Sequence, residues 1–481
     1  MKKLMFFALF LCALILNAGE KLPKYIILFI GDGMATPQRM IAEEFALKSG
    51  YGKLAINHLP FHATTRTVST SSLVTDSAAA GTAIACGTKT ANGRIGVDPR
   101  GKKLESVAEL AKKKNYKVGI ISNMVINHAT PASFYGHRTS RQEYYELGLD
   151  LIESNFDLFA GGGIRQISGK GTAKTVQNAK KAPKGAAAKA AEPEKIAPKP
   201  DLYALARKKG YLTFNKKKDF LALKPGCGKF IYSAAPGYMP AAMDTTEAGT
   251  TLEEMTVKAL ELLKNPKGFF LMVEGGAIDS YGHANEAAAN LHEVLALDKA
   301  VKAALEFLKK HPDETLIVIT GDHETGGMTM GFAGSGYSMS TERLAFQKGT
   351  VTKFRQLLKE AKEKVEGKPD AKTKADAKKF TFADARKLLT DYFGFKFTSE
   401  DKNDPMLLSP QQIKMLEEGF KKGTLHNAAK IVVSQKAGIG WTTGSHTALP
   451  VLTTSTGVQA ERFTGFIDNT DIARKLKGLL R

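Results

Sequence analysis

Cysteine is scarce in this chain, with three residues among 481. Cys12 lies in the N-terminal segment described below, so at most one disulfide can form in the remainder, between Cys86 and Cys227. An oxidising compartment would favour that bridge, whereas a pair of buried thiols is equally compatible with the composition. Both interpretations stay open at the level of sequence, and cross-linking contributes at most one bond to the fold.

Apolar runs long enough to cross a membrane are also missing. The run Leu4–Leu16 is too short, because a membrane-spanning helix needs about 20 residues. It follows Lys2 and Lys3 and precedes small or polar residues, a pattern that predicts a cleaved signal peptide over residues 1–18 and a periplasmic or secreted protein. An uncleaved amphipathic anchor is the alternative, because Leu16 is a poor residue for cleavage.

Acidic residues are in deficit: 48 Asp and Glu face 69 Lys and Arg, which gives a net charge of +21. Much of the excess lies in residues 164–200, whose Ala, Lys and Pro content predicts a disordered basic loop, and around 359–379, which predict a solvated helix and linker. Aromatic residues do not interleave with these lysines, so the pattern favours a solubilising surface and predicts no specific nucleic-acid partner.

The chain is 43% hydrophobic and 24% charged, so it can bury a large core. Four apolar segments, typical of strands buried on both faces, run directly into polar residues. These are Asp32 after the first segment, His128 and Thr130 after the second, Glu274, Asp279 and His283 after the third, and Asp322 and His323 after the fourth. Helical patterns at 103–114 and 290–311 separate the segments and predict an α/β fold, a three-layer αβα sandwich with a large, mostly parallel central sheet.

In such a sheet, ligands bind in the crevice beyond the carboxyl ends of the strands, so we expect the four polar ends to converge there. Singly, Asp32 could be a turn residue, His283 a polar residue on a helix surface and Asp322 a loop cap. Jointly these explanations are poor, because Asp, Glu and His recur at the strand ends of a chain that has only ten histidines.

The spacing of these residues indicates which ions they would bind. Asp279 and His283 are four residues apart, so one turn of helix places both on one face. Asp322 and His323 are adjacent, which suits a turn. Carboxylate oxygen together with imidazole nitrogen suits zinc. Glu274 and the hydroxyl group of Thr130 offer only oxygen, which suits magnesium.

A nucleophile is predicted in the segment "STSSLVTDSAAAGTAIACG". Ser77 would begin a tightly packed helix, where free backbone N–H groups and the helix dipole favour an anion. The alternative is that Ser77 only caps this helix. Coordination to a metal ion would activate the hydroxyl group, and two ions about 4 Å apart can hold the attacking and leaving oxygens of a displacement at phosphorus. Arg141 could bind two phosphate oxygens with its planar guanidinium group.

The sequence resembles the alkaline phosphatase family of metal-dependent enzymes with a serine nucleophile. The resemblance is carried, in the order of the family, by the motifs "FIGDGM", "VTDSAAAGTA", "HATPASFYGHRTSR", "MVEGGAIDSYGH", "TGDHETGG" and "GSHTALPV". It covers residues 24–481 apart from the two basic segments and a helical stretch. It implies an alkaline phosphatase-like fold and hydrolysis of phosphate monoesters, with a homodimer as the assembly.

The resemblance also implies a role for each site residue. Ser77 would form a phosphoserine intermediate, and Arg141 would bind the phosphoryl group. Two zinc ions and one magnesium ion would be bound, the first zinc by Asp279, His283 and His446, the second by Asp322 and His323 with Asp32 as a bridge, and the magnesium by Asp32, Thr130 and Glu274. His446 enters through the resemblance alone, since no strand end predicts it.

Two positions depart from the family pattern. His128 stands where some members carry aspartate, which bears on the preference of the third metal site. Ser280 stands where several members have lysine, histidine or tryptophan, so a water-mediated contact to phosphate is expected to be lost.

The motifs predict one catalytic domain, residues 19–335 and 427–481, with a helical insertion at 336–426. Within the insertion, Ser409 and Pro410 are typical of a helix start, and "FADARKLLTDYFGF" predicts a second helix. Whether this insertion is a lid beside the active site or a surface appendage stays open.

Two other functions compete with the phosphomonoesterase. A phosphodiesterase could use the same metal scaffold, although related diesterases commonly use threonine and Arg141 favours a dianionic monoester. A sulfatase is disfavoured, because Ser77 is followed by alanines and not by Pro and Arg. The other candidate is a non-catalytic, metal-stabilised envelope protein that binds anionic polymers through its basic segments.

Overall fold

The computed structural model describes residues 21–168, 199–367 and 379–481. The predicted signal peptide at 1–18 lies outside these ranges, as does most of the predicted basic loop at 164–200. In the described part of the chain, no helix combines the length and the apolar character needed to span a bilayer.

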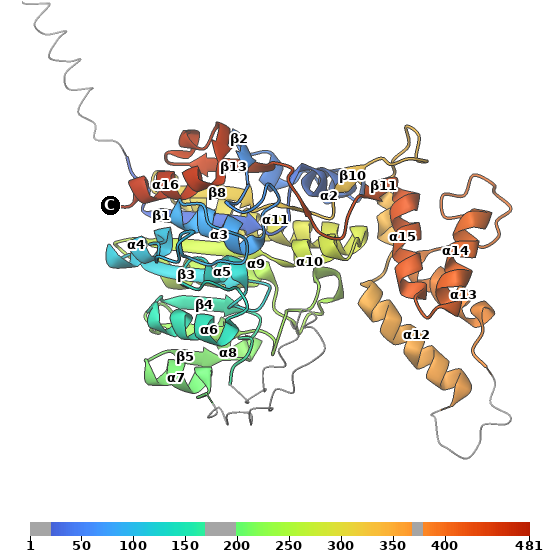
Figure 1. Cartoon of the computed structure of the whole chain (residues 1–481), viewed down its shortest axis with the longest axis horizontal. Helices are drawn as coiled ribbons and strands as arrows, with labels where there is room; N and C mark the ends of the chain where they lie inside the picture. Colours follow the sequence, from blue (N-terminus) through green and yellow to red (C-terminus); the bar gives the residue numbers. More distant parts are fainter. Residues whose placement is uncertain (1–20, 169–198, 368–378) are drawn as a thin grey trace, which may run out of the picture.

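A ten-stranded sheet forms the centre of the molecule (Figure 1). In spatial order its strands are β14 (Gly465–Asp468), β2 (Phe61–Arg66), β13 (Val451–Gly457), β8 (Thr315–Gly321), β1 (Tyr25–Gly31), β7 (Phe269–Gly275), β3 (Lys117–Ser122), β4 (Leu158–Gly161), β6 (Phe230–Ser233) and β5 (Leu212–Phe214). Strand β13 runs antiparallel to both of its neighbours, and the other strand pairs are parallel. The predicted mostly parallel sheet is confirmed.

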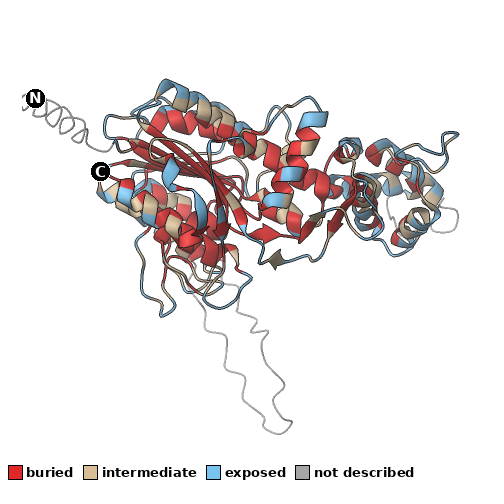
Figure 2. Cartoon of the chain, turned by 90° about the horizontal axis from the view of Figure 1, so that it is seen from above, coloured by how far each residue is buried: buried red, intermediate tan, exposed pale blue. Residues whose placement is uncertain are grey.

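Helices cover both faces of the sheet, because the central strands are apolar on both faces. In β1, Ile27 and Phe29 pack into one core, and Ile26 and Leu28 pack into the other. The first core is covered by α2 (Thr36–Lys48), α8 (Lys217–Leu221), α9 (Leu252–Leu263) and α11 (Ala287–Lys310). The second is covered by α3 (Ser77–Cys86), α4 (Val107–Lys113), α5 (Ala129–Ala132), α6 (Tyr144–Glu153), α7 (Leu202–Lys208) and α16 (Asn469–Leu479). Figure 2 shows the buried strands between these layers, the predicted αβα sandwich.

The central strands end in register at one edge of the sheet. Gly31, the last residue of β1, pairs with Gly275 of β7 and with Gly321 of β8. Ser122, the last residue of β3, pairs with Glu274. The residues that follow these strands therefore emerge side by side, which confirms the predicted convergence of the four strand ends.

A lobe of four helices extends beyond this edge, at the right of Figure 1. It contains α12 (Val351–Glu366), α13 (Phe382–Phe393), α14 (Pro410–Lys421) and α15 (Leu425–Ala437). As predicted, α14 starts at Pro410, and the Ser409 hydroxyl accepts a hydrogen bond from the backbone N–H of Gln412. Buried side chains of the lobe, such as Phe354 and Val432, belong to the same apolar cluster as α11. Helix α15 crosses the predicted domain boundary at residue 427.

The two cysteines of the described chain are free thiols. Cys86 is buried at the end of α3, and burial raises the pKa of its thiol to about 12. Cys227 is partly exposed. Of the two possibilities left by the sequence, the structure therefore shows free thiols and no bridge between these residues.

A substitution at the end of β8 tests the packing that supports the converging strand ends. A β-carbon at Gly321 would lie 2.2 Å from the carbonyl oxygen of Met34. We therefore expect Gly321→Ala to lower the free energy of unfolding by about 1–3 kcal/mol, because backbone atoms must shift. The matched control is Gly478→Ala in α16, where a β-carbon meets no atom within 4 Å. Urea unfolding of both variants measures the effect, and equal stability of the two would contradict it.

Candidate active site

The converged strand ends bring three groups of possible metal ligands together. Within each group, the ligand atoms lie within 4.8 Å of one another. The groups are Asp279, His283 and His446; Asp32, Asp279 and His323; and Asp32, His128 and Glu274. Shared members, Asp32 and Asp279, connect the groups into one cluster.

The first group combines a helix with a distant strand. Helix α10 (Ala277–His283) places Asp279 and His283 one turn apart, and His283 Nε2 lies 3.4 Å from Asp279 Oδ1. His446 Nε2 lies 3.1 Å from His283 Nε2 and 3.4 Å from the same carboxylate oxygen. The predicted helical spacing of Asp279 and His283 is confirmed.

The pairing of two short strands places His446 in this group, and Glu324 forms hydrogen bonds that support the pairing. Strand β12 (His446–Thr447) pairs with β9 (Glu324–Thr325), which directly follows His323. Glu324 Oε1 accepts a hydrogen bond of 2.8 Å from Gln38 Nε2, and Glu324 Oε2 accepts one from the hydroxyl group of Thr447. Sequence reasoning missed Glu324, although it lies inside the "TGDHETGG" motif.

The second group surrounds His323, in the turn after β8. His323 Nε2 lies 3.4 Å from Asp32 Oδ1 and 3.2 Å from Asp322 Oδ2. The other oxygen of Asp322 accepts hydrogen bonds from the backbone N–H groups of Gly33 (3.0 Å) and His323 (2.9 Å). One oxygen of Asp322 thus anchors the turn, and the other faces the imidazole.

All three imidazoles of the first two groups turn Nε2 inward. His283 Nδ1 lies 2.8 Å from the carbonyl oxygen of Gly444, and His446 Nδ1 lies 2.8 Å from that of Thr75. Since a carbonyl oxygen only accepts, each of these Nδ1 atoms carries a proton, and in the neutral ring Nε2 keeps the lone pair that can bind a metal ion. Metal-binding histidines are commonly oriented in this way.

Thr325 orients the third imidazole and links the two groups. Its hydroxyl donates to Asp279 Oδ1 over 2.6 Å and lies 3.2 Å from His323 Nδ1. Because the hydroxyl proton is directed to Asp279, the Thr325 oxygen can accept the N–H of His323. Burial also lowers the pKa of His323 well below its usual value, so the ring is neutral. Thr325 is another residue of the motif that sequence reasoning missed.

Several buried atoms of the cluster have no hydrogen-bond partner among the described residues. They are Asp322 Oδ2, Glu274 Oε1 and His128 Nδ1. Buried polar atoms are rarely left unpaired, and each of these is a carboxylate oxygen or an imidazole nitrogen able to bind a metal ion. The donor set therefore fits divalent metal ions.

The charge of the cluster supports the same conclusion. Asp32, Glu274 and Asp322 are fully buried together. Burial, with repulsion between the carboxylates, raises the pKa of Asp322 to about 7, that of Glu274 to about 8 and that of Asp32 well above its usual range. Cations are needed to keep these groups ionised at neutral pH.

The third group differs in one respect from the expected magnesium ligands. His128, and not only Thr130, approaches Asp32 and Glu274. Thr130 donates its hydroxyl hydrogen to Asp32 Oδ2 over 3.1 Å. Burial lowers the pKa of His128 to about 4, so its imidazole is neutral and can act as a ligand. The hydroxyl group of Ser122 donates to Glu274 Oε2, whereas Glu274 Oε1 is the oxygen that has no partner among the described residues.

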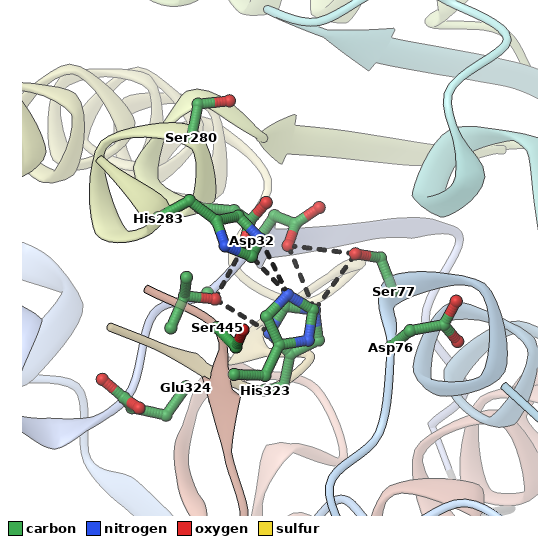
Figure 3. A network of polar contacts seen from close by, with 12 residues as sticks. Asp32, Asp76, Ser77, Ser280, His283, His323, Glu324 and Ser445 are labelled. Atoms are coloured by element: carbon green, nitrogen blue, oxygen red, sulfur yellow. Dashed lines mark hydrogen bonds and ion pairs between the residues drawn. The ribbon is translucent and has the colours of Figure 1, made fainter. Parts of the chain in front are cut away.

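Ser77 lies against the cluster as the first residue of α3 (Figure 3). Its Oγ lies 3.1 Å from His323 Nε2 and 3.5 Å from Asp32 Oδ1. Asp76 is the residue that caps the helix, since its Oδ1 accepts a hydrogen bond of 3.0 Å from the backbone N–H of Ala79. The alternative that Ser77 is only a cap is therefore wrong.

Asp76 also holds Arg141 beside Ser77. Arg141 Nη1 donates to Asp76 Oδ2 over 3.0 Å, and the backbone N–H of Gly93 donates to the same oxygen over 2.9 Å. Burial disfavours the charged guanidinium, but the ion pair with Asp76 outweighs it and raises the pKa of Arg141. Ser280 does not join the cluster: it lies apart from it on α10 in Figure 3, and its Oγ lies 3.9 Å from Met124 Sδ.

The link made by Thr325 can be tested without measuring activity. We expect Thr325→Val to weaken zinc binding by about 10- to 100-fold, because Asp279 loses a donor and His323 loses the acceptor that orients it. The control is Thr320→Val, which removes a buried hydroxyl bonded to Thr453 and to the carbonyl of Gly321, neither of which is a proposed metal ligand. Competition with a chromogenic chelator measures both affinities, and equal values would contradict this role.

Comparison with known proteins agrees with this geometry. The model of the family described as alkaline phosphatase matches residues 23–481. Alkaline phosphatase 3 of Bacillus subtilis (strain 168) is 31% identical over 469 residues, which cover 94% of this chain and 88% of the relative. Alkaline phosphatase 4 of the same organism is 32% identical over 418 residues, covering 85% and 77%.

A solved structure shows the same fold over nearly the whole chain. The cold-active alkaline phosphatase from Shewanella sp. superimposes with a TM-score of 0.76 at 26% sequence identity, covering 95% of this chain and 100% of that one. With the ligand groups, Ser77 and Arg141 in place, the chain belongs to the alkaline phosphatase family of metal-dependent phosphate-ester hydrolases.

Proposed function

We propose that this protein hydrolyses phosphate monoesters through a phosphoserine intermediate on Ser77, with two zinc ions and one magnesium ion bound. One observation carries the proposal. Ser77 Oγ lies within hydrogen-bond distance of His323 Nε2, inside a buried ligand cluster, with a charged arginine held next to it by Asp76. A nucleophile, metal ligands and a phosphate-binding group thus share one site.

The ligand sets are proposed as follows. Asp279, His283 and His446 bind the first zinc ion, Asp32, Asp322 and His323 bind the second, and Asp32, Thr130 and Glu274 bind the magnesium ion with His128 adjacent. Bound divalent ions supply Lewis-acid chemistry, which favours the ionised forms of the serine hydroxyl and of water and neutralises charge on phosphate oxygens.

The side chains then perform two displacements at phosphorus. The Ser77 oxygen attacks, the serine O–P bond forms, and the bond to the leaving alcohol breaks. Water attacks the phosphoserine in the second step, the serine O–P bond breaks, and phosphate is released. Arg141 holds two phosphate oxygens through both steps, and the N-terminus of α3 faces the same negative charge.

Arg141 also bears on the choice between monoesters and diesters. The dianionic phosphoryl group of a monoester offers the guanidinium more negative charge than a diester does, which supports the monoester. A phosphodiesterase on the same metal scaffold is the alternative, and a non-catalytic protein that binds anionic polymers is the other. We further propose export, on the pattern at residues 1–18, and a homodimer, on the family resemblance.

Replacement of the nucleophile tests the phosphoserine step. We expect Ser77→Ala, with metals bound, to lower kcat for p-nitrophenyl phosphate by at least about 10³-fold, because the attacking oxygen is lost. Ser72→Ala, on the exposed loop before the helix, is the control. The same preparations are assayed with bis-p-nitrophenyl phosphate. A preference for the diester would favour the phosphodiesterase, and no hydrolysis of either ester by the unmodified protein would favour the binding protein.

Metal removal tests the ligand sets. We expect dialysis against a chelator to abolish hydrolysis, and zinc together with magnesium to restore it, because the carboxylates and imidazoles need cations to form the site. Elemental analysis of the restored protein should give two zinc ions and one magnesium ion per chain. Full activity in the metal-free protein, or restoration by magnesium alone, would contradict the proposal.

A further inference from the structure

A cavity of about 410 Å³ is lined in part by Ser280, the residue that follows the proposed zinc ligand Asp279 in α10. Its lining includes Met124, Ser280, Tyr281, Arg355, His426 and Lys430. Most of these residues come from α10 of the catalytic domain and from α12 and α15 of the four-helix lobe, all of which lie beyond the carboxyl edge of the sheet in Figure 1. None of these side chains belongs to the cluster of metal ligands.

Basic side chains dominate the charged part of this lining. Arg355 of α12 is exposed and has neither a hydrogen bond nor an ion pair with another described residue. Lys430 of α15 donates to the carbonyl oxygen of Ala284, which leaves further N–H groups of its ammonium without a partner in the described chain. His426 lies one turn before Lys430, and burial followed by repulsion from Arg355 and Lys430 lowers its pKa, so the three side chains share one electrostatic environment.

Glu286 is the acidic residue of the lining, Asp244 lies near it, and both carboxylates accept hydrogen bonds from neighbouring residues. Glu286 Oε1 accepts hydrogen bonds of 2.9 Å from Gln347 Nε2 and 2.8 Å from the backbone N–H of Val351. Asp244 accepts from the hydroxyl group of Thr350 over 2.6 Å. Among the described residues, no ion pair joins Arg355 or Lys430 to a carboxylate, and Glu286 acts on Lys430 only through its charge, so the lining keeps an excess of positive charge.

We propose that this cavity receives the leaving group of the substrate and selects phosphate monoesters that carry a second anionic group, which Arg355 and Lys430 bind. The proposal rests on the proposed phosphatase function, because it places the reacting phosphate at Ser77. Met124 and Tyr281 supply an apolar wall for the carbon chain between the two anions, and the Ser280 hydroxyl group contacts the sulfur of Met124. The substrate class is thus a small organic bisphosphate or a phosphorylated acid.

Bisphosphates of straight-chain diols of increasing length, compared with the monophosphates of the same diols, test the selection. The measured quantity is the ratio of kcat/KM for the bisphosphate to that for the monophosphate. We expect the ratio to reach about 10 at one chain length, which corresponds to about 1.4 kcal/mol, and to fall at least fivefold in Arg355→Ala/Lys430→Ala. The Arg355→Lys variant should keep more of this kcat/KM ratio than the double alanine variant does.

A charge-matched control separates local contact from the general positive field of the protein. Lys359→Ala/Lys422→Ala removes two exposed positive charges from the same lobe, outside the cavity, and should keep the ratio. A ratio that shows only the small statistical advantage of two reactive ends, at every chain length, overturns the proposal. So does an equal fall in the control variant, and so does a ratio independent of length, which would indicate a separate anion site.

A binding measurement keeps this test independent of the proposed function. If no ester is hydrolysed, the phosphatase proposal fails, and calorimetry of metal-loaded Ser77→Ala still compares the hexane-1,6-diol bisphosphate with its monophosphate. Tighter binding of the bisphosphate that is lost with Arg355 and Lys430 supports the cavity. Equal affinities for the two probes overturn it.

Discussion

The fold buries several carboxylates close together, and the rest of the structure depends on how their mutual repulsion is neutralised. Asp32, Glu274, Asp279 and Asp322 lie at the edge of the sheet with almost no exposed surface. The hydrogen bonds among the described residues do not remove this repulsion, because unpaired oxygens remain on Glu274 and Asp322. Divalent cations do remove it, so the same groups that would destabilise a metal-free fold create strong metal sites.

The parallel register of the sheet is what brings these carboxylates together. Strands β8, β1 and β7 end at paired glycines, and the functional loops therefore start from fixed positions. Two small polar joints complete the site: Thr325 connects Asp279 with His323, and Asp76 connects the start of α3 with Arg141. Rigid strands set the ligand positions, and the joints set the orientation of the ligand atoms.

The sequence was sufficient to predict those site residues that directly follow a buried strand. The apolar runs before Asp32, Glu274 and Asp322 predicted both the sheet and the edge at which ligands meet, and the helical spacing of Asp279 and His283 predicted their pairing. His446 could not be derived in this way, because its position depends on pairing between β9 and β12, far apart in the chain. The roles of Thr325 and Asp76 were missed since threonine and aspartate are common in turns, and only tertiary contacts reveal what they do.

The pairing between β9 and β12 has a consequence for biogenesis. His446 and the strand that docks it come from the C-terminal part of the polypeptide, whereas Asp32 and Ser77 come from the N-terminal part. The proposed first zinc site is therefore incomplete until nearly the whole chain has been synthesised and its most distant segments have met. Acquisition of the full metal complement marks a finished molecule, and a prematurely terminated one remains inert toward phosphate esters.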